Sequence, residues 1–340
     1  MSAKMSNNLL EVIDLRTSFD TERGNVTAVD GVSFSVAPGE VVGVVGESGC
    51  GKSVTAESIL QLLDPSSTSY SGQILFGGDN LLRLSEDALR KVRGYRISMI
   101  FQDPMSALNP VFTIGDQLTE AILAHKRIGK RRARAFAIEL LAKTGIPEPE
   151  SRMRQYPHQL SGGQRQRVMI AMALSCDPEL LIADEPTTAL DVTTQAQILK
   201  LLIELKDEFD AGILFITHDL GVVAEICDRV VVMYLGEVVE YTDVHTLFDN
   251  PAHPYTRGLM ASTPGIDADP EDDLPIIPGA VPTLHHIPQG CRFAERCALV
   301  LPECRQQTIE LEVLSDDHAS RCIRSAELAT GASLSNGGVR

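Results

Sequence analysis

Short apolar runs recur along the chain, and glycine or polar residues follow each of them. Three of these runs lie within residues 40–45, 180–185 and 213–219. Runs of this kind are typical of strands that are buried on both faces of a parallel sheet. Because such strands gather their carboxyl ends at one edge, the residues that follow the runs are candidates for a ligand site.

Helical periodicity appears between these runs. Residues 54–63 predict one helix, and residues 161–176 predict a second that Ser161 caps and that ends before Pro178. Residues 193–209 predict a third helix with one apolar face, which we interpret as core packing. The apolar side chains of that face are Ile198, Leu201, Leu202, Leu205 and Phe209. The combination of buried strands and helices predicts an α/β fold.

A glycine-rich turn, residues 46–53, separates the first run from the first predicted helix. This is the strand, turn and helix context of a phosphate-binding loop, although a turn without a ligand is the alternative. Glycines let backbone N–H groups converge on an anion, and the helix dipole adds to the attraction. Lys52 would contact the β- and γ-phosphates of a nucleotide, and the Ser53 hydroxyl would bind Mg²⁺. The predicted nucleotide-binding residues of this turn are Gly46, Glu47, Ser48, Gly49, Cys50, Gly51, Lys52 and Ser53.

Acidic and imidazole side chains follow the other two runs. Asp184 would hold Mg²⁺, and Glu185 would act as the general base that polarises the attacking water. An apolar run that ends in two acids is also common where a strand merely reaches solvent. His218 follows the third run, where its imidazole could contact the γ-phosphate, although a lone histidine after a strand usually has no such role.

Composition narrows the functional classes. The formal net charge of −16 argues against a protein whose main task is to grip nucleic acid. The basic run at residues 126–134 contains no aromatic side chain for base stacking, so we interpret it as the solvated start of a helix. We expect no export signal and no membrane-spanning helix, since the longest apolar stretch, residues 168–174, is far below the roughly 20 residues that a bilayer needs. With seven cysteines and no export signal, we expect the reducing cytosol.

One further motif, residues 160–167, resembles the signature of ATP-binding-cassette (ABC) ATPases. The other marks of that family occur in the expected order: Gln102 matches the Q-loop, residues 189–191 match the D-loop, and His218 matches the switch histidine. The resemblance implies that Lys52, Gln102, Glu185 and His218 serve catalysis and that Ser53, Gln102 and Asp184 hold Mg²⁺. It also implies that a second cassette caps the ATP in trans. The remaining nucleotide contacts implied are Ser161, Gly162, Gly163, Gln164 and Asp191. Phe19 lies where the family places an aromatic that stacks on adenine, and an ordinary core or surface phenylalanine is the alternative.

The resemblance extends to the ATPase subunits of bacterial dipeptide and oligopeptide importers, through residues 101–110 and 250–257. It implies a second, different ATPase subunit, two membrane permease subunits, an external peptide-binding protein, and a place on the cytoplasmic face of the membrane. Importers of nickel and some sugars share much of this pattern. Two competing interpretations are a soluble ABC ATPase that acts on nucleic acid or ribosomes, and a non-hydrolysing regulatory subunit. We expect no nucleic-acid partner.

The resemblance also implies a domain organisation. A P-loop, RecA-like α/β core would occupy residues 8–260, with an antiparallel β edge near residues 9–36 and 72–76. A helical subdomain would span about residues 103–165. Residues 261–340 would form a small irregular extension, connected by an acidic linker at residues 264–273.

Four of the seven cysteines lie in this extension. Cys291, Cys297, Cys304 and Cys322 have the spacing C-x5-C-x6-C-x17-C. A short, proline-rich segment builds little core, so a metal would stabilise it. Four thiolates suit a [4Fe–4S] cluster or tetrahedral zinc, and the spacing favours the cluster; free thiols are the third interpretation. The extension resembles the C-terminal domain of dipeptide-importer ATPases, and this resemblance implies that the four cysteines bind a [4Fe–4S] cluster.

Overall fold

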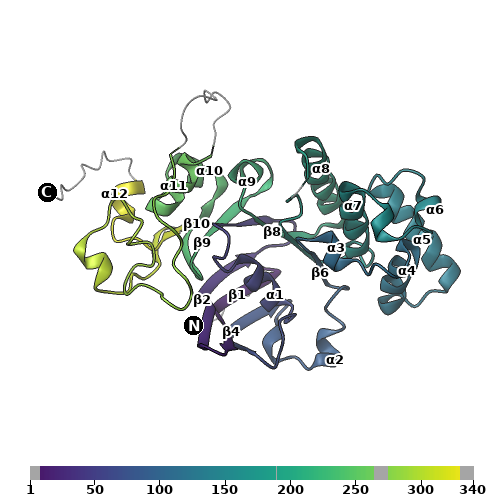
Figure 1. Ribbon diagram of the computed structural model, residues 1–340, viewed down its shortest axis with the longest axis horizontal. Helices are drawn as coiled ribbons and strands as arrows, with labels where there is room; N and C mark the ends of the chain where they lie inside the picture. The colour runs from purple at the N-terminus through teal and green to yellow at the C-terminus, as the bar shows by residue number, and fades with distance from the viewer. Residues whose placement is uncertain (1–7, 189, 264–274, 330–340) are drawn as a thin grey trace. The chain divides into compact units, whose positions relative to one another are not determined.

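The computed structural model describes residues 8–188, 190–263 and 275–329 (Figure 1). The chain forms two compact units, each built from several segments. Of the described residues, 11–35, 42–75, 217–263 and 275–329 form one unit, which contains residues 46–53 and is called the phosphate-loop unit here. The other unit contains the described residues 8–10, 36–41, 76–188 and 190–216, and is called the signature unit. The acidic segment predicted as a linker lies outside the described residues.

The phosphate-loop unit is organised around a sheet with strand order β3-β9-β10-β12-β11. Strand β3 (Val41–Val45) is buried throughout and pairs in parallel with β9 (Arg229–Tyr234), as predicted for a buried parallel strand. Strand β10 (Glu237–Asp243) then pairs antiparallel with both β9 and β12 (His318–Ser320). Because β12 also pairs with β11 (Glu312–Ser315), a C-terminal hairpin continues this sheet.

A buried hydrogen bond between His318 and Glu240 holds this hairpin on the sheet. His318 Nε2 lies 2.9 Å from Glu240 Oε1, and the Glu240 side chain is fully buried. The same carboxylate accepts hydrogen bonds from the backbone N–H groups of Ala252 and His253, at 2.6 and 3.0 Å. The carboxylate is therefore satisfied by several donors, as a buried charge requires.

A second sheet in this unit has the order β2-β1-β4. Its strands are β1 (Leu10–Thr21), β2 (Gly24–Val36) and β4 (Thr68–Phe76), which correspond to the β edge predicted near residues 9–36 and 72–76. Strand β4 begins before the predicted segment. The helices of the unit are α1 (Lys52–Ile59), α9 (Leu220–Ile226), α10 (Val244–Asp249), α11 (Pro254–Ala261) and α12 (Ser325–Ala329).

The signature unit contains three parallel strands in the order β6-β7-β8. They are β6 (Ile97–Ile100), β7 (Leu180–Asp184) and β8 (Gly212–Thr217), and every residue in them is buried. This confirms the interpretation of the second and third apolar runs as strands of a parallel sheet. Helix α8 (Val192–Phe209) follows β7 in the chain and buries Ile198, Leu201 and Leu202.

Helices surround a separate apolar core in the same unit. Helices α4 (Ile114–His125), α5 (Lys130–Lys143) and α7 (Gly162–Ala173) contribute its buried side chains, which include Leu118, Leu141 and Val168. The unit also contains the short helices α2 (Glu86–Leu89), α3 (Pro104–Ala107) and α6 (Pro149–Arg152).

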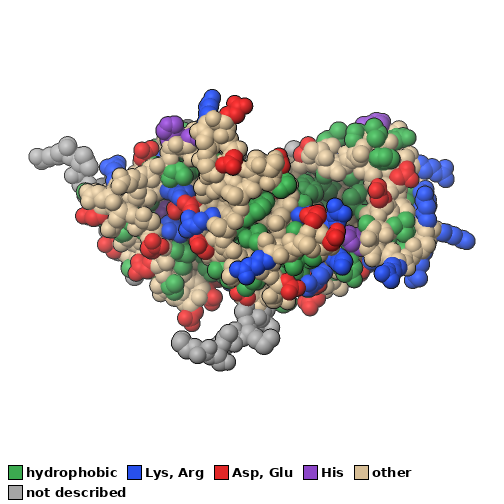
Figure 2. All heavy atoms as spheres, turned by 90° about the horizontal axis from the view of Figure 1, so that it is seen from below, with side chains coloured by type: hydrophobic (Ala, Val, Ile, Leu, Met, Phe, Trp, Pro, Cys, Tyr) green, Lys and Arg blue, Asp and Glu red, His purple; other side chains and the backbone are tan. Residues whose placement is uncertain are grey.

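The basic run leads into α5, as expected for a solvated helix start. Arg131, Arg132 and Arg134 are exposed. Figure 2 shows Lys and Arg side chains gathered on the right of the view, the side on which Figure 1 places α5. Among the described residues, no helix has the length and apolar character that crossing a bilayer requires.

Candidate functional site

Three glycines shape the predicted phosphate loop, and two of them leave no room for a side chain. Gly46, Gly49 and Gly51 have φ angles of +151°, +81° and +102°, which L-residues rarely adopt. A Cβ on Gly46 would lie 2.2 Å from the Met233 carbonyl oxygen, and one on Gly51 would lie 2.7 Å from that of Ala28. The loop between β3 and α1 therefore needs glycine at these positions for both backbone conformation and space.

Lys52 is the buried cation of this loop. Its ammonium group donates hydrogen bonds to the carbonyl oxygens of Gly46 and Glu47, at 2.7 and 3.1 Å. Cys50 is also buried, with its Sγ 3.8 Å from Lys52 Nζ, and burial raises the pKa of the Cys50 thiol. The lysine thus lies folded back on the loop that the sequence assigns to the phosphates.

The structure adds two loop contacts that the sequence did not predict. The Glu47 N–H donates to the Tyr255 hydroxyl at 2.7 Å. The Arg296 guanidinium donates to both Glu47 carboxylate oxygens, at 2.5 and 2.9 Å. Tyr255 belongs to α11, and Arg296 lies between two of the four C-terminal cysteines, so neither position carries a local sequence signal for loop binding.

Three further predicted residues belong to the phosphate-loop unit. Ser53 lies in the first turn of α1 and is half-buried. His218 is exposed just after β8, beside Asp219, whose carboxylate caps α9. Phe19 lies on β1 and is half-buried, so part of its ring is open to a stacking partner.

In the signature unit, the two predicted acids terminate β7. Asp184 is its last residue and is buried. Glu185 follows with a φ of +45°, and its N–H donates to the Ile216 carbonyl at 2.9 Å. A glutamate in the left-handed region stores local strain of the kind that is concentrated at functional sites.

The structure brings Gln102 to Glu185. Gln102 Nε2 donates to Glu185 Oε2 at 2.9 Å, and the Thr188 hydroxyl donates to the same oxygen, also at 2.9 Å. Gln102 follows β6, the neighbour of β7, which explains why residues far apart in sequence meet at one strand end.

The predicted signature residues start α7, as the sequence indicates. Ser161 is its N-cap and forms a capping box with Gln164: the Gln164 N–H donates to Ser161 Oγ at 3.3 Å, and the Ser161 N–H donates to Gln164 Oε1 at 3.1 Å. A Cβ on Gly162 would meet no atom within 4 Å, whereas one on Gly163 would lie 2.9 Å from Thr194. The start of α7 is thus open on one side and packed on the other.

The signature and the D-loop aspartate share one cavity. It is open to solvent and is lined by Ser161, Gly162, Gly163, Gln164 and Asp191, among others. Asp191 caps α8 and accepts hydrogen bonds from the Thr194 N–H and hydroxyl, at 3.0 and 2.7 Å, which lower the pKa of its carboxyl group. Ala189 of the predicted D-loop lies outside the described residues.

The four C-terminal cysteines line a different and much smaller cavity. Two of their sulfurs accept backbone hydrogen bonds at 3.4 Å, Cys297 from Leu299 and Cys322 from Arg324. Burial raises the pKa of Cys297 to about 11 and that of Cys322 to about 12, and it also raises the pKa of Cys291.

The prediction of a metal at these cysteines is not supported as it stands. Within residues 8–188, 190–263 and 275–329, no three His, Cys, Asp or Glu side chains lie close enough to share one metal ion. The arrangement therefore speaks against a preformed tetrahedral zinc site. A four-iron cluster binds each thiolate at a different iron, so its ligands stand farther apart than those of a single ion.

Two family models match the chain. The model described as ABC transporter matches residues 29–188. The model described as oligopeptide/dipeptide transporter, C-terminal region, matches residues 239–304. The second match contains Arg296 and three of the four cysteines, Cys291, Cys297 and Cys304.

Relatives with long matches carry peptide-transport names. The probable peptide ABC transporter ATP-binding protein y4tR of Sinorhizobium fredii is 54% identical over 94% of this chain and 96% of its own length. The dipeptide transport ATP-binding protein DppD of Bacillus subtilis is 50% identical, over 96% of this chain and 98% of its own length. The oligopeptide transport ATP-binding protein OppD of Mycobacterium tuberculosis is 52% identical over 96% of this chain. The match covers only 53% of the length of that relative.

Among solved structures, the dimeric bacterial ABC transporter cassette MJ0796 has a TM-score of 0.62 and 29% identity to this chain. The match covers 69% of this chain and 98% of MJ0796, and the same cassette is also known in a post-hydrolysis state bound to ADP and Pi. The likeness confirms the predicted α/β fold class of a P-loop ATPase. The chain belongs to the ATPases of the ABC transporter family, in the branch of peptide-transporter ATP-binding proteins.

Proposed function

We propose that this chain is the ATP-hydrolysing subunit of an importer of dipeptides or oligopeptides. The observation that carries the proposal is the combination of two features in one chain. The phosphate loop and the two acids at the end of β7 are intact, which a degenerate, regulatory subunit would not require. The C-terminal region matches the type found in oligopeptide and dipeptide transporters.

The proposed chemistry is hydrolysis of the γ-phosphate by an activated water. The glycine-shaped loop presents backbone N–H groups to the phosphates, and Lys52 exchanges its two carbonyl partners for phosphate oxygens. Ser53, Gln102 and Asp184 are the proposed ligands of Mg²⁺, which would neutralise the developing charge when bound. Glu185 takes a proton from the attacking water as general base, and the exposed His218 imidazole donates to the γ-phosphate.

A second cassette would complete each ATP site. The open side of Gly162 and the cavity beside it leave space for a ligand that another polypeptide presents. We infer that the partner is a different ATPase chain and that Ser161, Gly162, Gly163, Gln164 and Asp191 act toward its nucleotide.

Membrane permease subunits are the proposed partners of the surface around the Q-loop. Large apolar side chains are exposed in this segment, which contains Phe101, Met105, Val111 and Phe112. Val111 is 71% exposed and Phe112 is 50% exposed. Exposed apolar side chains concentrated in one segment mark a protein interface. Such docking would hold the chain on the cytoplasmic face of the membrane.

The cysteine cavity is the proposed site of a [4Fe–4S] cluster, with zinc as the less favoured occupant. Its support is the common cavity of the four thiols and the two backbone N–H groups that donate to sulfur. The test is anaerobic purification of the full chain, followed by iron, sulfide and zinc analysis and by absorbance spectroscopy. Stoichiometric zinc, or no metal at all, would refute the cluster.

The function itself is tested by isolating the intact assembly from detergent-solubilised membranes and identifying its polypeptides. Reconstituted into vesicles with its binding protein, the assembly should accumulate labelled dipeptides or oligopeptides only when MgATP is supplied on the side of the ATPase. Uptake of nickel or sugar instead of peptide would refute the substrate class. Co-purification with nucleic acid or ribosomes, without membrane proteins, would refute transport altogether.

A further inference from the structure

The C-terminal region reaches the phosphate loop through one buried arginine. The side chain of Arg296 is 5% exposed, and its guanidinium binds both oxygens of the Glu47 carboxylate, at 2.5 and 2.9 Å. Two parallel hydrogen bonds to one carboxylate fix its orientation as well as its charge. Glu47 is the second residue of the loop, so this contact acts directly on the segment that receives the phosphates.

Arg296 is itself held in place. Its Nε donates to the Pro278 carbonyl at 2.9 Å, and the guanidinium lies over the rings of Tyr234 and Phe293, at 5.8 and 6.0 Å. The hydrogen bonds to Glu47 raise the pKa of Arg296, so the guanidinium stays charged. Its conformation is therefore set before any nucleotide arrives.

Aromatic residues attach the same part of the loop from a second direction. The Tyr255 hydroxyl accepts the Glu47 N–H at 2.7 Å. The rings of Tyr255, Tyr234 and Phe293 form a cluster with centroid distances of 4.7 to 5.3 Å. Phe293 belongs to the same segment as Arg296, so backbone and side chain of Glu47 are both attached to one packed cluster.

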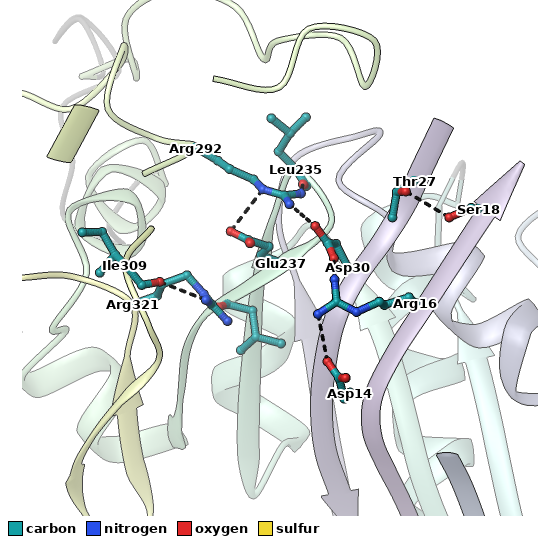
Figure 3. Close-up of polar contacts among 11 residues, drawn as sticks. Asp14, Arg16, Ser18, Thr27, Asp30, Leu235, Glu237, Arg292, Ile309 and Arg321 are labelled. Carbon is teal, nitrogen blue, oxygen red and sulfur yellow. Dashed lines mark hydrogen bonds and ion pairs between the residues drawn. The ribbon is translucent and has the colours of Figure 1, made fainter. Parts of the chain in front are cut away.

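A second arginine anchors this segment, as Figure 3 shows. Arg292 pairs with Asp30 and with Glu237, the latter at 3.2 Å, and donates to the Leu235 carbonyl at 2.6 Å. Both carboxylates belong to the phosphate-loop unit, on β2 and β10. The backbone that carries Arg296 is thus fixed four residues upstream.

We propose that Arg296 is a positioning residue for ATP binding, which holds Glu47 in the phosphate loop and neutralises its carboxylate beside the triphosphate. Holding Glu47 in place preserves the loop conformation in which the backbone N–H groups converge. Neutralising its carboxylate matters because an unpaired negative charge next to the phosphates would repel them at short range. The inference goes beyond the proposed function and rests on it only in that the loop binds ATP.

The test measures the dissociation constant of MgATP for the full chain, together with its thermal stability. Arg296→Gln should raise Kd about tenfold, as expected for losing a charged, bidentate contact. Arg296→Lys keeps the charge without the fork geometry and should recover part of the affinity.

Glu47→Gln should weaken binding less than Arg296→Gln. The double variant should bind more tightly than Arg296→Gln alone, because it removes the carboxylate that Arg296 neutralises.

Arg321 offers a matched control. Like Arg296, it directly precedes a cysteine of the cavity, but it donates to the carbonyls of Val238 and Ile309, at 2.9 Å each, and not to the loop (the Ile309 bond is drawn in Figure 3). Arg321→Gln should lower the melting temperature while leaving the Kd of MgATP unchanged.

Two results would overturn the inference. One is an Arg296→Gln chain that binds MgATP as tightly as the wild type. The other is a pair of losses, from Arg296→Gln and Glu47→Gln, that simply multiply in the double variant, since this would show that the residues act separately. If Arg296→Gln does not fold, Arg296→Lys takes its place, alone and combined with Glu47→Gln. The same two results would then overturn the inference. A wild-type chain that does not bind MgATP would instead refute the proposed function.

Discussion

Gln102 and Glu185 are joined by a hydrogen bond of 2.9 Å from the side-chain amide of Gln102 to the carboxylate of Glu185. The acceptor oxygen also receives the Thr188 hydroxyl, so the proposed general base is held by two donors. Both hydrogen bonds end on Oε2, so they fix the orientation of the carboxylate that we propose as the general base.

Glu185→Gln should abolish turnover and preserve binding. An amide has the same shape as the carboxylate but takes no proton from water, so hydrolysis should fall by about 10²- to 10⁴-fold. The measurement is ATP hydrolysis by the assembled transporter, beside the Kd of MgATP for the isolated chain. Undiminished hydrolysis, with the partner cassette inactivated, would contradict the assignment of the base.

Lys52→Ala should act on binding itself. Lys52 is the buried cation of the loop, and its removal deletes the charge that the phosphates would meet. We expect the Kd of MgATP to rise at least tenfold with little change in melting temperature, because the hydrogen-bond partners of the lysine, two carbonyls and the Cys50 sulfur, belong to the loop itself. Gly46→Ala is the complementary change: it should distort the loop, since its Cβ would lie 2.2 Å from the Met233 oxygen. A Lys52→Ala chain with wild-type affinity would contradict the role of Lys52.

Local patterns predicted the buried strands, the phosphate loop and the N-cap of α7, because each depends on residues that are close in sequence. The contacts of Arg296 and Tyr255 with Glu47 were not predictable in this way, since 249 and 208 positions separate the partners. Nor did a proline-rich, irregular composition reveal that β11 and β12 continue the sheet of β10. The cysteine spacing likewise indicated a metal but gave no distances, and distances decide between an ion, a cluster and free thiols.

Gly162→Asp should separate the trans role of the signature from its role in folding. Gly162 is the first residue of α7 and has room for a side chain, and an acidic residue there favours the helix dipole. We expect unchanged melting temperature and unchanged MgATP affinity for the isolated chain. Hydrolysis by the assembled pair of cassettes should be lost, because the new carboxylate would face the phosphates of the partner's nucleotide. Loss of ATP affinity in the isolated chain would contradict action in trans.

Val111→Ser combined with Phe112→Ser should release the chain from its membrane partners. Both side chains are exposed, so their replacement should leave the melting temperature nearly unchanged. Loss of the apolar contact should lower the yield of co-purified permease several-fold. A matched control is Val313→Ser, which removes a side chain of similar exposure, 73%, from β11. Equal recovery of permease with all variants would argue against docking at this segment.

His253 should make the protein sensitive to mild acid. It is fully buried, and this burial lowers its pKa to about 4, from the ordinary value of 6.5. The folded chain therefore keeps a neutral imidazole at pH 5, whereas the unfolded chain binds a proton there, and the free energy of unfolding falls as the pH drops below 6.5. At about 1.4 kcal/mol per pH unit, acidification from pH 6.5 to 5 should cost about 2 kcal/mol.

Asparagine at position 253 tests this directly. His253 caps α11 by accepting the Tyr255 N–H at its Nδ1, at 3.1 Å, and asparagine is a good N-cap that does not titrate. His253→Asn should lower stability at pH 7 through imperfect packing, yet lose less on acidification than the wild type does. The measurement is the melting temperature of both chains between pH 7 and pH 5. Parallel curves would show that His253 does not carry the acid sensitivity.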